Sequence, residues 1–301
     1  FTFIRQAMKL AQKLVVNYFR AELNMLSLVS KKLAAEKALD LFCTPMRKPK
    51  RKTPSVFNEA ERLSFSIDKN TIRVYRWNSP SENKVLIVHG FESSAKNFER
   101  YVTALIQMGF EVVAFDAPAH GESSGTQINL PLYLSTVQKM YEMYGPVQNY
   151  ITHSYGGLVV SHFLETIPHG DTTKAVLIAP ATETVSIIDS FFKFLRLNGR
   201  VRKEFDRLIY ERSGHWPQHF SVRRAMNNIK ASVLWFHDRG DELTPVADAL
   251  KVKDDKHPNI YFRITSGLGH RKIYRDNDVM KEILEFLSPQ AILKRTIHED
   301  L

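Results

Sequence analysis

The stretch "ITHSYGGLVV" at residues 151–160 decides how this chain folds, because it places one serine between a short apolar run and two glycines. Residues 149–153 read as a buried strand and residues 156–166 as a helix, so Ser154 falls on the turn between them. A serine on such a turn projects its hydroxyl beyond the end of the sheet. Serine is also a common helix N-cap, which is the competing interpretation of the same residue.

The familiar motif for this turn is G-x-S-x-G, and the sequence departs from it at the first position. Thr152 stands where the first glycine is expected, whereas Gly156 matches the second. Because that first glycine mainly relieves crowding, a β-branched residue is tolerable there at some cost in strain. Gly157 is expected to let the new helix pack close to a neighbouring strand.

Strand and helix patterns alternate on both sides of this turn. Segments 63–67 and 71–77 alternate like two antiparallel strands. Continuous apolar runs follow, as is typical of strands covered on both faces, and helical patterns separate most of them. These runs lie at residues 84–90, 111–116, 149–153, 175–179, 232–237 and 260–264. The sequence therefore predicts an α/β fold with a mostly parallel, doubly wound sheet.

Two regions depart from this alternation of strands and helices. Residues 1–55 read as an N-terminal helical extension, with a break at Asn24 or Ser27, followed by a proline-rich basic linker. The rest, residues 56–301, forms the α/β domain. Within it, residues 181–230 show helical patterns without a strand, which predicts a cap inserted beyond the carboxyl edge of the sheet, where such folds bind ligands. We expect the N-terminal helix to pack on the α/β body, with peripheral contact to a membrane as the alternative.

The composition limits the classes of partner, metal and cofactor that we expect this chain to bind. The formal net charge of +10 favours anionic partners without specifying one. Cys43 is the single cysteine, so no intrachain disulfide forms, which fits a reducing, cytoplasmic compartment. The sequence shows no metal-ligand spacing and no phosphate-binding glycine loop, so we expect neither a metal nor a cofactor. No aromatic residues interleave with the basic run from Arg47 to Lys52, which argues against specific nucleic-acid binding.

A serine hydroxyl reacts only when a base takes its proton and an acid orients that base. Asp241 lies in the loop after the strand at 232–237, with Asp238 as the alternative acid, and His270 follows the last strand. The order serine, acid, histidine is the one this architecture uses. Because carboxyl ends of parallel strands meet at one edge of a sheet, we expect the three side chains to lie together.

The negative charge that develops on an attacked carbonyl oxygen needs preorganised N–H donors. One donor is expected from the residue after the serine, Tyr155, and the other from the loop after an earlier strand. Phe91 holds that place, directly after His89 and Gly90. We expect His89 to brace the loop by hydrogen bonding and not to act as a base.

These segments together resemble the α/β-hydrolase superfamily. The matching motifs, in chain order, are "VLIVHGF" (85–91), "GFEVVAFDAPAHGES" (109–123), "ITHSYGG" (151–157), "HDRGDELTP" (237–245) and "GLGH" (267–270). The resemblance implies the α/β-hydrolase fold, a catalytic triad of Ser154, Asp241 and His270, and Phe91 and Tyr155 as oxyanion donors. Ala119 departs from the usual G-H-G-x-S segment. The chain also resembles uncharacterised bacterial single-domain members that carry an N-terminal helical extension.

A serine nucleophile in this fold implies a serine hydrolase that cleaves a carboxylic ester of a small-molecule acyl substrate through an acyl-enzyme. The basic residues of the cap favour an anionic or lipid-like substrate, with a solvated cap surface as the alternative interpretation. A thioesterase, peptidase or acyltransferase of the same fold, or a non-catalytic ligand-binding protein, are the alternatives. The cap is expected to line an acyl pocket with apolar side chains, since small-molecule sites are mostly apolar. These side chains are Phe191, Phe192, Phe194 and Leu195.

Overall fold

The computed structural model describes residues 10–46 and 52–288. They form two compact units, each described by itself. The sheet unit comprises the described residues of 45–182 and 222–288, and the helical unit comprises residues 10–44 and Glu183–Ser221. Most of the basic linker, residues 47–51, lies outside the described residues. None of the helices in the described ranges is both long and apolar enough to span a lipid bilayer.

Eight strands form one sheet in the order β1-β2-β4-β3-β5-β6-β7-β8. β1 and β2 form an antiparallel hairpin, and β2 pairs antiparallel with β4. All pairings from β4 through β8 are parallel, which confirms the predicted α/β-hydrolase fold class. The strands are β1 (Glu61–Ile67), β2 (Asn70–Trp77), β3 (Lys84–Val88), β4 (Glu111–Phe115), β5 (Asn149–His153), β6 (Lys174–Ile178), β7 (Ser232–Asp238) and β8 (Ile260–Thr265).

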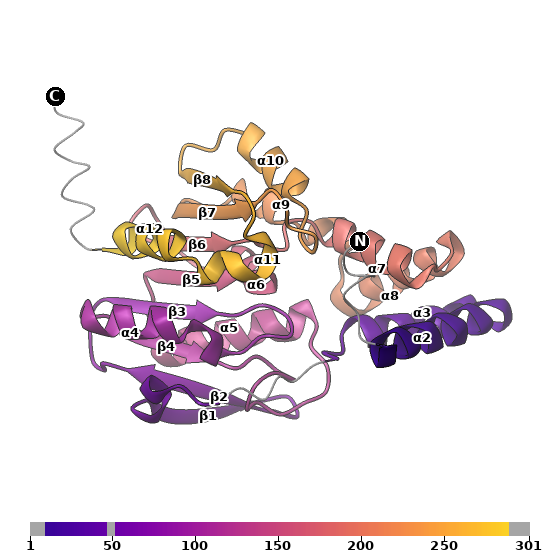
Figure 1. Cartoon of the computed structure of the whole chain (residues 1–301), viewed down its shortest axis with the longest axis horizontal. Coiled ribbons are helices and arrows are strands. Elements are labelled where there is room, and N and C mark those ends of the chain that lie inside the picture. The colour runs from indigo at the N-terminus through magenta and orange to yellow at the C-terminus, as the bar shows by residue number, and fades with distance from the viewer. Residues whose placement is uncertain (1–9, 47–51, 289–301) are drawn as a thin grey trace. The chain divides into compact units, whose positions relative to one another are not determined.

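Helices cover both faces of this sheet, which explains why β4, β5, β6 and β7 are buried along their whole length. Figure 1 shows α4 (Glu99–Gln107) and α12 (Asn277–Leu287) on the near side, and α5 (Leu130–Tyr144) and α6 (Tyr155–Leu164) on the far side. Asn129 caps α5 by accepting the Leu132 N–H, as its sequence pattern predicts. The shorter elements are η1 (Ser55–Asn58), η2 (Ala95–Phe98), α9 (Val222–Met226), α10 (Val246–Asp254), α11 (Gly269–Lys272) and η4 (Ile273–Arg275).

The helical unit joins two segments that are far apart in the sequence. α2 (Leu10–Val29) and α3 (Lys31–Phe42) pack with α7 (Thr184–Leu195) and α8 (Gly199–Ser213), and η3 (Pro217–His219) closes the insertion. Small residues on α3 allow close packing against α8. The buried core of the unit contains Leu23, Ala34, Ala35, Ala38, Leu39, Ile188, Phe192, Leu195, Val201, Phe205 and Leu208.

Two expectations about this region need correction. The N-terminal helix is expected to pack on the α/β body, whereas α2 and α3 pack with α7 and α8 of the insertion. Their break falls at Ser30, whose hydroxyl accepts the Leu33 N–H as the N-cap of α3, and not at Asn24 or Ser27. Phe192 and Leu195 are buried in the unit's own core, and Phe191 and Phe194 pack against it, while their place in an acyl pocket stays a prediction. The predicted domain limits at 55, 181 and 230 stay predictions.

The turn between β5 and α6 sets how closely α6 approaches the sheet. A methyl group on Gly156 would lie 2.2 Å from the carbonyl oxygen of Val88 in β3. One on Gly157 would lie 2.7 Å from Cβ of Pro180. Thr152 fits without a glycine, because its hydroxyl donates to the carbonyl oxygen of Val176 on the neighbouring strand at 2.9 Å.

Replacing Gly156 with alanine should therefore destabilise the fold. Because the clash is with backbone, it cannot be relieved by turning a side chain, and overpacking of this kind costs about 2 kcal/mol or more. We expect Tm in thermal denaturation to fall by roughly 4–8 °C. Gly170→Ala is the matched control, since nothing lies within 4 Å of the added methyl group. Equal melting of the two variants would contradict the close approach of α6 to β3.

Candidate active site

Ser154 adopts a backbone conformation that serine rarely occupies. Its φ and ψ are 54° and −119°, and a residue with a side chain in such a region costs about 1–3 kcal/mol. Neighbouring strands and loops hold it there. The Ser154 N–H donates to Ile178 at 3.0 Å, and its carbonyl oxygen accepts the N–H groups of Gly157 and Ala181, each at 3.0 Å. Its side chain makes no capping hydrogen bond, so the N-cap interpretation does not describe this serine.

His270 and Asp241 meet at the same edge of the sheet. His270 lies in α11, and its Nδ1 is 2.8 Å from Oδ2 of Asp241, which lies in the loop after β7. Asp241 is held by its own loop, since Oδ1 accepts the N–H groups of Leu243 and Thr244 at 2.9 and 2.8 Å. The imidazole therefore has a fixed carboxylate behind it, which is the arrangement that orients a catalytic base.

The alternative acid, Asp238, has a different role. Its Oδ1 accepts the Gly240 N–H at 2.9 Å, and its Oδ2 accepts from the Thr265 hydroxyl at 2.8 Å and the Leu268 N–H at 3.0 Å. Both oxygens thus tie the loop that carries the acid to the loop that carries the histidine. The structure brings Asp241, and not Asp238, to the His270 ring.

Asp241 is buried, yet it stays ionised. Burial alone would raise the pKa of Asp241, but the hydrogen bond and charge of His270, with the hydrogen bonds from Thr244, outweigh burial and hold that pKa below its usual value. The Thr244 hydroxyl lies 2.8 Å from Oδ2 of Asp241 and 3.1 Å from Nδ1 of His270, so it touches both partners. This role of Thr244 is not evident from the sequence, where its place three residues after the acid is the available signal.

His153, directly before Ser154, supports the histidine loop. Its Nε2 lies 2.9 Å from the carbonyl oxygen of His270, and because a carbonyl only accepts, Nε2–H is the donor. The His153 ring also lies 4.7 Å from that of His270 and 4.6 Å from that of Tyr274. Its Nδ1 is buried without a hydrogen-bond partner in the described residues, and it lies where a side chain on Gly90 would come within 3.1 Å.

The loop after β3 also touches Ser154. A methyl group on Gly90 would lie 2.8 Å from Cβ of Ser154. The next residue, Phe91, meets no hydrogen-bond acceptor for its N–H within the described ranges, and the Tyr155 N–H lies in the first turn of α6. Their rings are 6.4 Å apart in an edge-to-face contact. The structure thus brings together the two residues expected to bind an oxyanion.

Two other histidines brace this loop. His89 Nδ1–H donates to the Gly90 carbonyl oxygen at 2.7 Å, and Nε2 accepts the Ala117 N–H at 3.0 Å. Burial lowers the pKa of His89 to about 4. His120 accepts the Glu92 N–H at 2.9 Å through Nε2. With both ring nitrogens occupied, His89 is a brace and not a base. Ala119 has a φ of 66°, the left-handed conformation for which the family uses glycine there.

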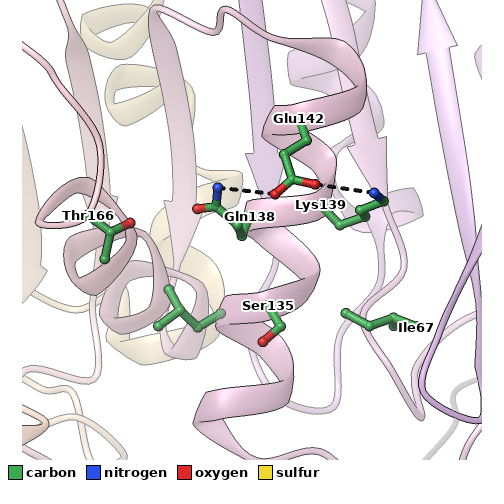
Figure 2. Close-up of a pocket in the computed structure, with 7 residues that line it drawn as sticks. Ile67, Ser135, Gln138, Lys139, Glu142 and Thr166 are labelled. Carbon is green, nitrogen blue, oxygen red and sulfur yellow. Dashed lines mark hydrogen bonds and ion pairs between the residues drawn. The ribbon is translucent and has the colours of Figure 1, made fainter.

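A surface pocket of about 420 Å³ lies away from these residues. It is lined by α5 and by Ile67 and Thr166, and Figure 2 shows Glu142 bonded to its neighbours Gln138 and Lys139. None of the predicted site residues lines it. No group of three or more His, Cys, Asp or Glu in the described part of the chain could hold a metal ion.

A mostly parallel sheet with a strained serine turn, and with acid and histidine loops at its carboxyl edge, defines the α/β-hydrolase fold. Residues 79–221 match the family model described as serine aminopeptidase, S33. The chain is 31% identical to human serine hydrolase-like protein 2 over 206 residues, which are 64% of this chain and 64% of that protein, so it spans less than two thirds of that relative.

Solved structures agree on the fold. The Pyrococcus furiosus esterase Pf2001 superposes with a TM-score of 0.60 at 21% identity, covering 81% of this chain and 95% of the esterase. Mouse alpha/beta hydrolase domain-containing protein 10 gives 0.56 at 16%, covering 79% and 100%. This chain therefore has the α/β-hydrolase fold.

The His153 contacts predict a pH dependence of stability. Burial, with the nearby charge of His270, lowers the pKa of His153 from 6.5 to about 3. Below pH 6.5 the unfolded chain therefore binds a proton that the folded chain does not, so the free energy of unfolding falls as pH falls. For this residue the slope is at most about 1.4 kcal/mol per pH unit between these values.

We expect His153→Gln to flatten the acid side of the stability profile by about that slope, measured by urea unfolding between pH 7 and pH 4.5. Glutamine keeps a donor but does not titrate. His215→Gln is the control, because that imidazole is exposed. An unchanged slope would mean that other buried histidines, such as His89 and His237, carry the acid dependence.

Proposed function

We propose that this chain is a serine hydrolase that cleaves carboxylic esters of small-molecule acyl substrates through an acyl-enzyme intermediate. The observation that carries the proposal is the strained Ser154 turn after β5, with the hydrogen-bonded pair of His270 and Asp241 at the same carboxyl edge of the sheet. Backbone strain of this kind persists mainly at functional sites, and presentation of a nucleophile at the end of a sheet accounts for it at Ser154.

In this mechanism Ser154 Oγ attacks the ester carbonyl carbon while His270 Nε2 takes its proton. The N–H groups of Phe91 and Tyr155 bind the oxyanion of the tetrahedral intermediate. Collapse of the intermediate breaks the bond to the alcohol, which leaves with the proton from His270. Water then attacks the acyl-enzyme, again with His270 as base, and releases the acid and free Ser154. Asp241 stabilises the imidazolium and fixes its tautomer.

The similar proteins support hydrolysis in its coarse form, since their names include an esterase and a serine hydrolase-like protein. The family model is named for a serine aminopeptidase, so ester against amide cleavage is a question for experiment. A cytoplasmic location is also part of the proposal. It rests on the single cysteine, Cys43, whose pKa burial raises to about 11.

A fluorophosphonate probe should label the protein, and Ser154→Ala should abolish labelling and p-nitrophenyl butyrate hydrolysis. Loss of the nucleophile removes covalent catalysis, so turnover should fall by about 10³-fold or more. Ser135→Ala, an exposed serine at the pocket on α5, is the matched control and should keep full activity. A folded protein that binds acyl ligands without labelling would be a non-catalytic binder; faster cleavage of a thioester or peptide amide would shift the substrate class.

Asp241→Asn should reduce kcat far more than Asp238→Asn. Asparagine at 241 favours the wrong imidazole tautomer, a change that costs about 10⁴-fold in a serine protease triad. Asp238 acts only through the loops that it joins. Both residues are buried aspartates a few positions apart, so each controls for the other in esterase assays and thermal denaturation. The opposite ranking would make Asp238 the acid.

A further inference from the structure

α2 has two apolar faces, and only one of them is used within the helical unit. Leu23 is fully buried in the core of that unit, and Leu26 packs against it. A second set of large apolar side chains points outward on the opposite side and falls within an arc of about 100° at helical spacing. This outer face of α2 consists of Leu14, Tyr18, Met25, Leu28 and Val29.

The outer face is unusually open. Met25 is 69% exposed, and Leu28 and Val29 are 87% and 85% exposed. Leu33 extends the surface onto the start of α3. Nine of the fourteen exposed large apolar side chains in the described residues lie in the helical unit, although it is the smaller of the two. A contiguous exposed apolar surface of this kind marks an interaction site.

The charges around the outer face indicate the kind of partner. Lys31 and Lys32 are exposed at the start of α3, directly after the end of α2. Glu22 is the single acidic residue of α2, and Lys37 neutralises it at 3.2 Å. The apolar surface is thus bordered by cations, in a chain whose net charge is +10.

We propose that the outer face of α2, together with Lys31 and Lys32, docks this chain on an anionic lipid surface. The apolar side chains enter the boundary between headgroups and acyl chains, and the ammonium groups meet lipid phosphates, as in interfacial helices. The helix lies in the surface plane, since no helix of the described residues can span a bilayer. A second copy of the chain fits less well, because it would bring a second cationic surface against the first.

The test is sedimentation of the full chain with vesicles of phosphatidylcholine alone or mixed equally with phosphatidylglycerol. We expect binding at least about tenfold stronger to the anionic vesicles, since each nearby lysine contributes about fivefold. Higher salt should weaken it. Ester hydrolysis is not part of the readout, so the proposal stands or falls separately from the proposed function.

Two sets of variants separate the apolar and charged contributions. Met25→Ser with Leu28→Ser should weaken binding to anionic vesicles by at least about tenfold, because their apolar surface no longer leaves water. Met143→Ser with Met108→Ser removes exposed methionines of the sheet unit and should leave binding unchanged. Lys31→Glu with Lys32→Glu should remove the preference for anionic lipid. The fold should tolerate this change, since acidic residues suit the first turn of a helix.

Three results would contradict docking of the outer face of α2 on an anionic lipid surface. Equal binding to both vesicle types would overturn the electrostatic part, and equal loss in the methionine control would overturn the assignment to α2. Absence of vesicle binding, with a dimer in light scattering that Met25→Ser with Leu28→Ser dissociates, would make a second copy the occupant. Unchanged Tm in every variant excludes unfolding as the cause.

Discussion

The left-handed backbone at Ser154 is the constraint on which the site depends. It is maintained because its N–H and carbonyl oxygen are both satisfied, by Ile178 on one side and by Gly157 and Ala181 on the other. The same turn requires Gly156, since a side chain there would meet the Val88 carbonyl oxygen at 2.2 Å. Packing of α6 on β3 and presentation of the serine are therefore one structural requirement, and strain at the serine is balanced by contacts around it.

Several hydrogen bonds from buried polar side chains hold the loops around this turn in place. His153 holds the His270 backbone, His89 holds Gly90, and Asp238 joins the two loops that carry the acid and the base. Burial lowers the pKa of His89 and of His153, so these imidazoles remain neutral braces at neutral pH. Neutral supports place no extra charge beside the hydrogen-bonded Asp241 and His270.

In the helical unit, the insertion between β6 and β7 packs with the N-terminal helices α2 and α3. The insertion leaves after β6 and returns beside its exit, where the Val222 N–H donates to the Thr182 carbonyl oxygen at 2.8 Å. Its aromatic side chains pack with Phe42 of α3, at ring distances of 5.1 Å to Phe191 and 5.7 Å to Phe205. Because these aromatic side chains pack in the core of the helical unit, that unit is stabilised by its own packing. The outer face of α2 takes no part in this core and stays exposed.

The sequence by itself determined the sheet, its helices and the order of serine, acid and histidine, because these depend on local periodicity and on turn residues near each strand end. It did not reveal the packing of the N-terminal helices, because contacts such as Arg20 with the Phe194 carbonyl oxygen join residues 174 positions apart. Nor did it separate Asp241 from Asp238 by geometry, or show the roles of Thr244 and His153. Those choices depend on how loops from different strands meet at one edge of the sheet, which only tertiary packing decides.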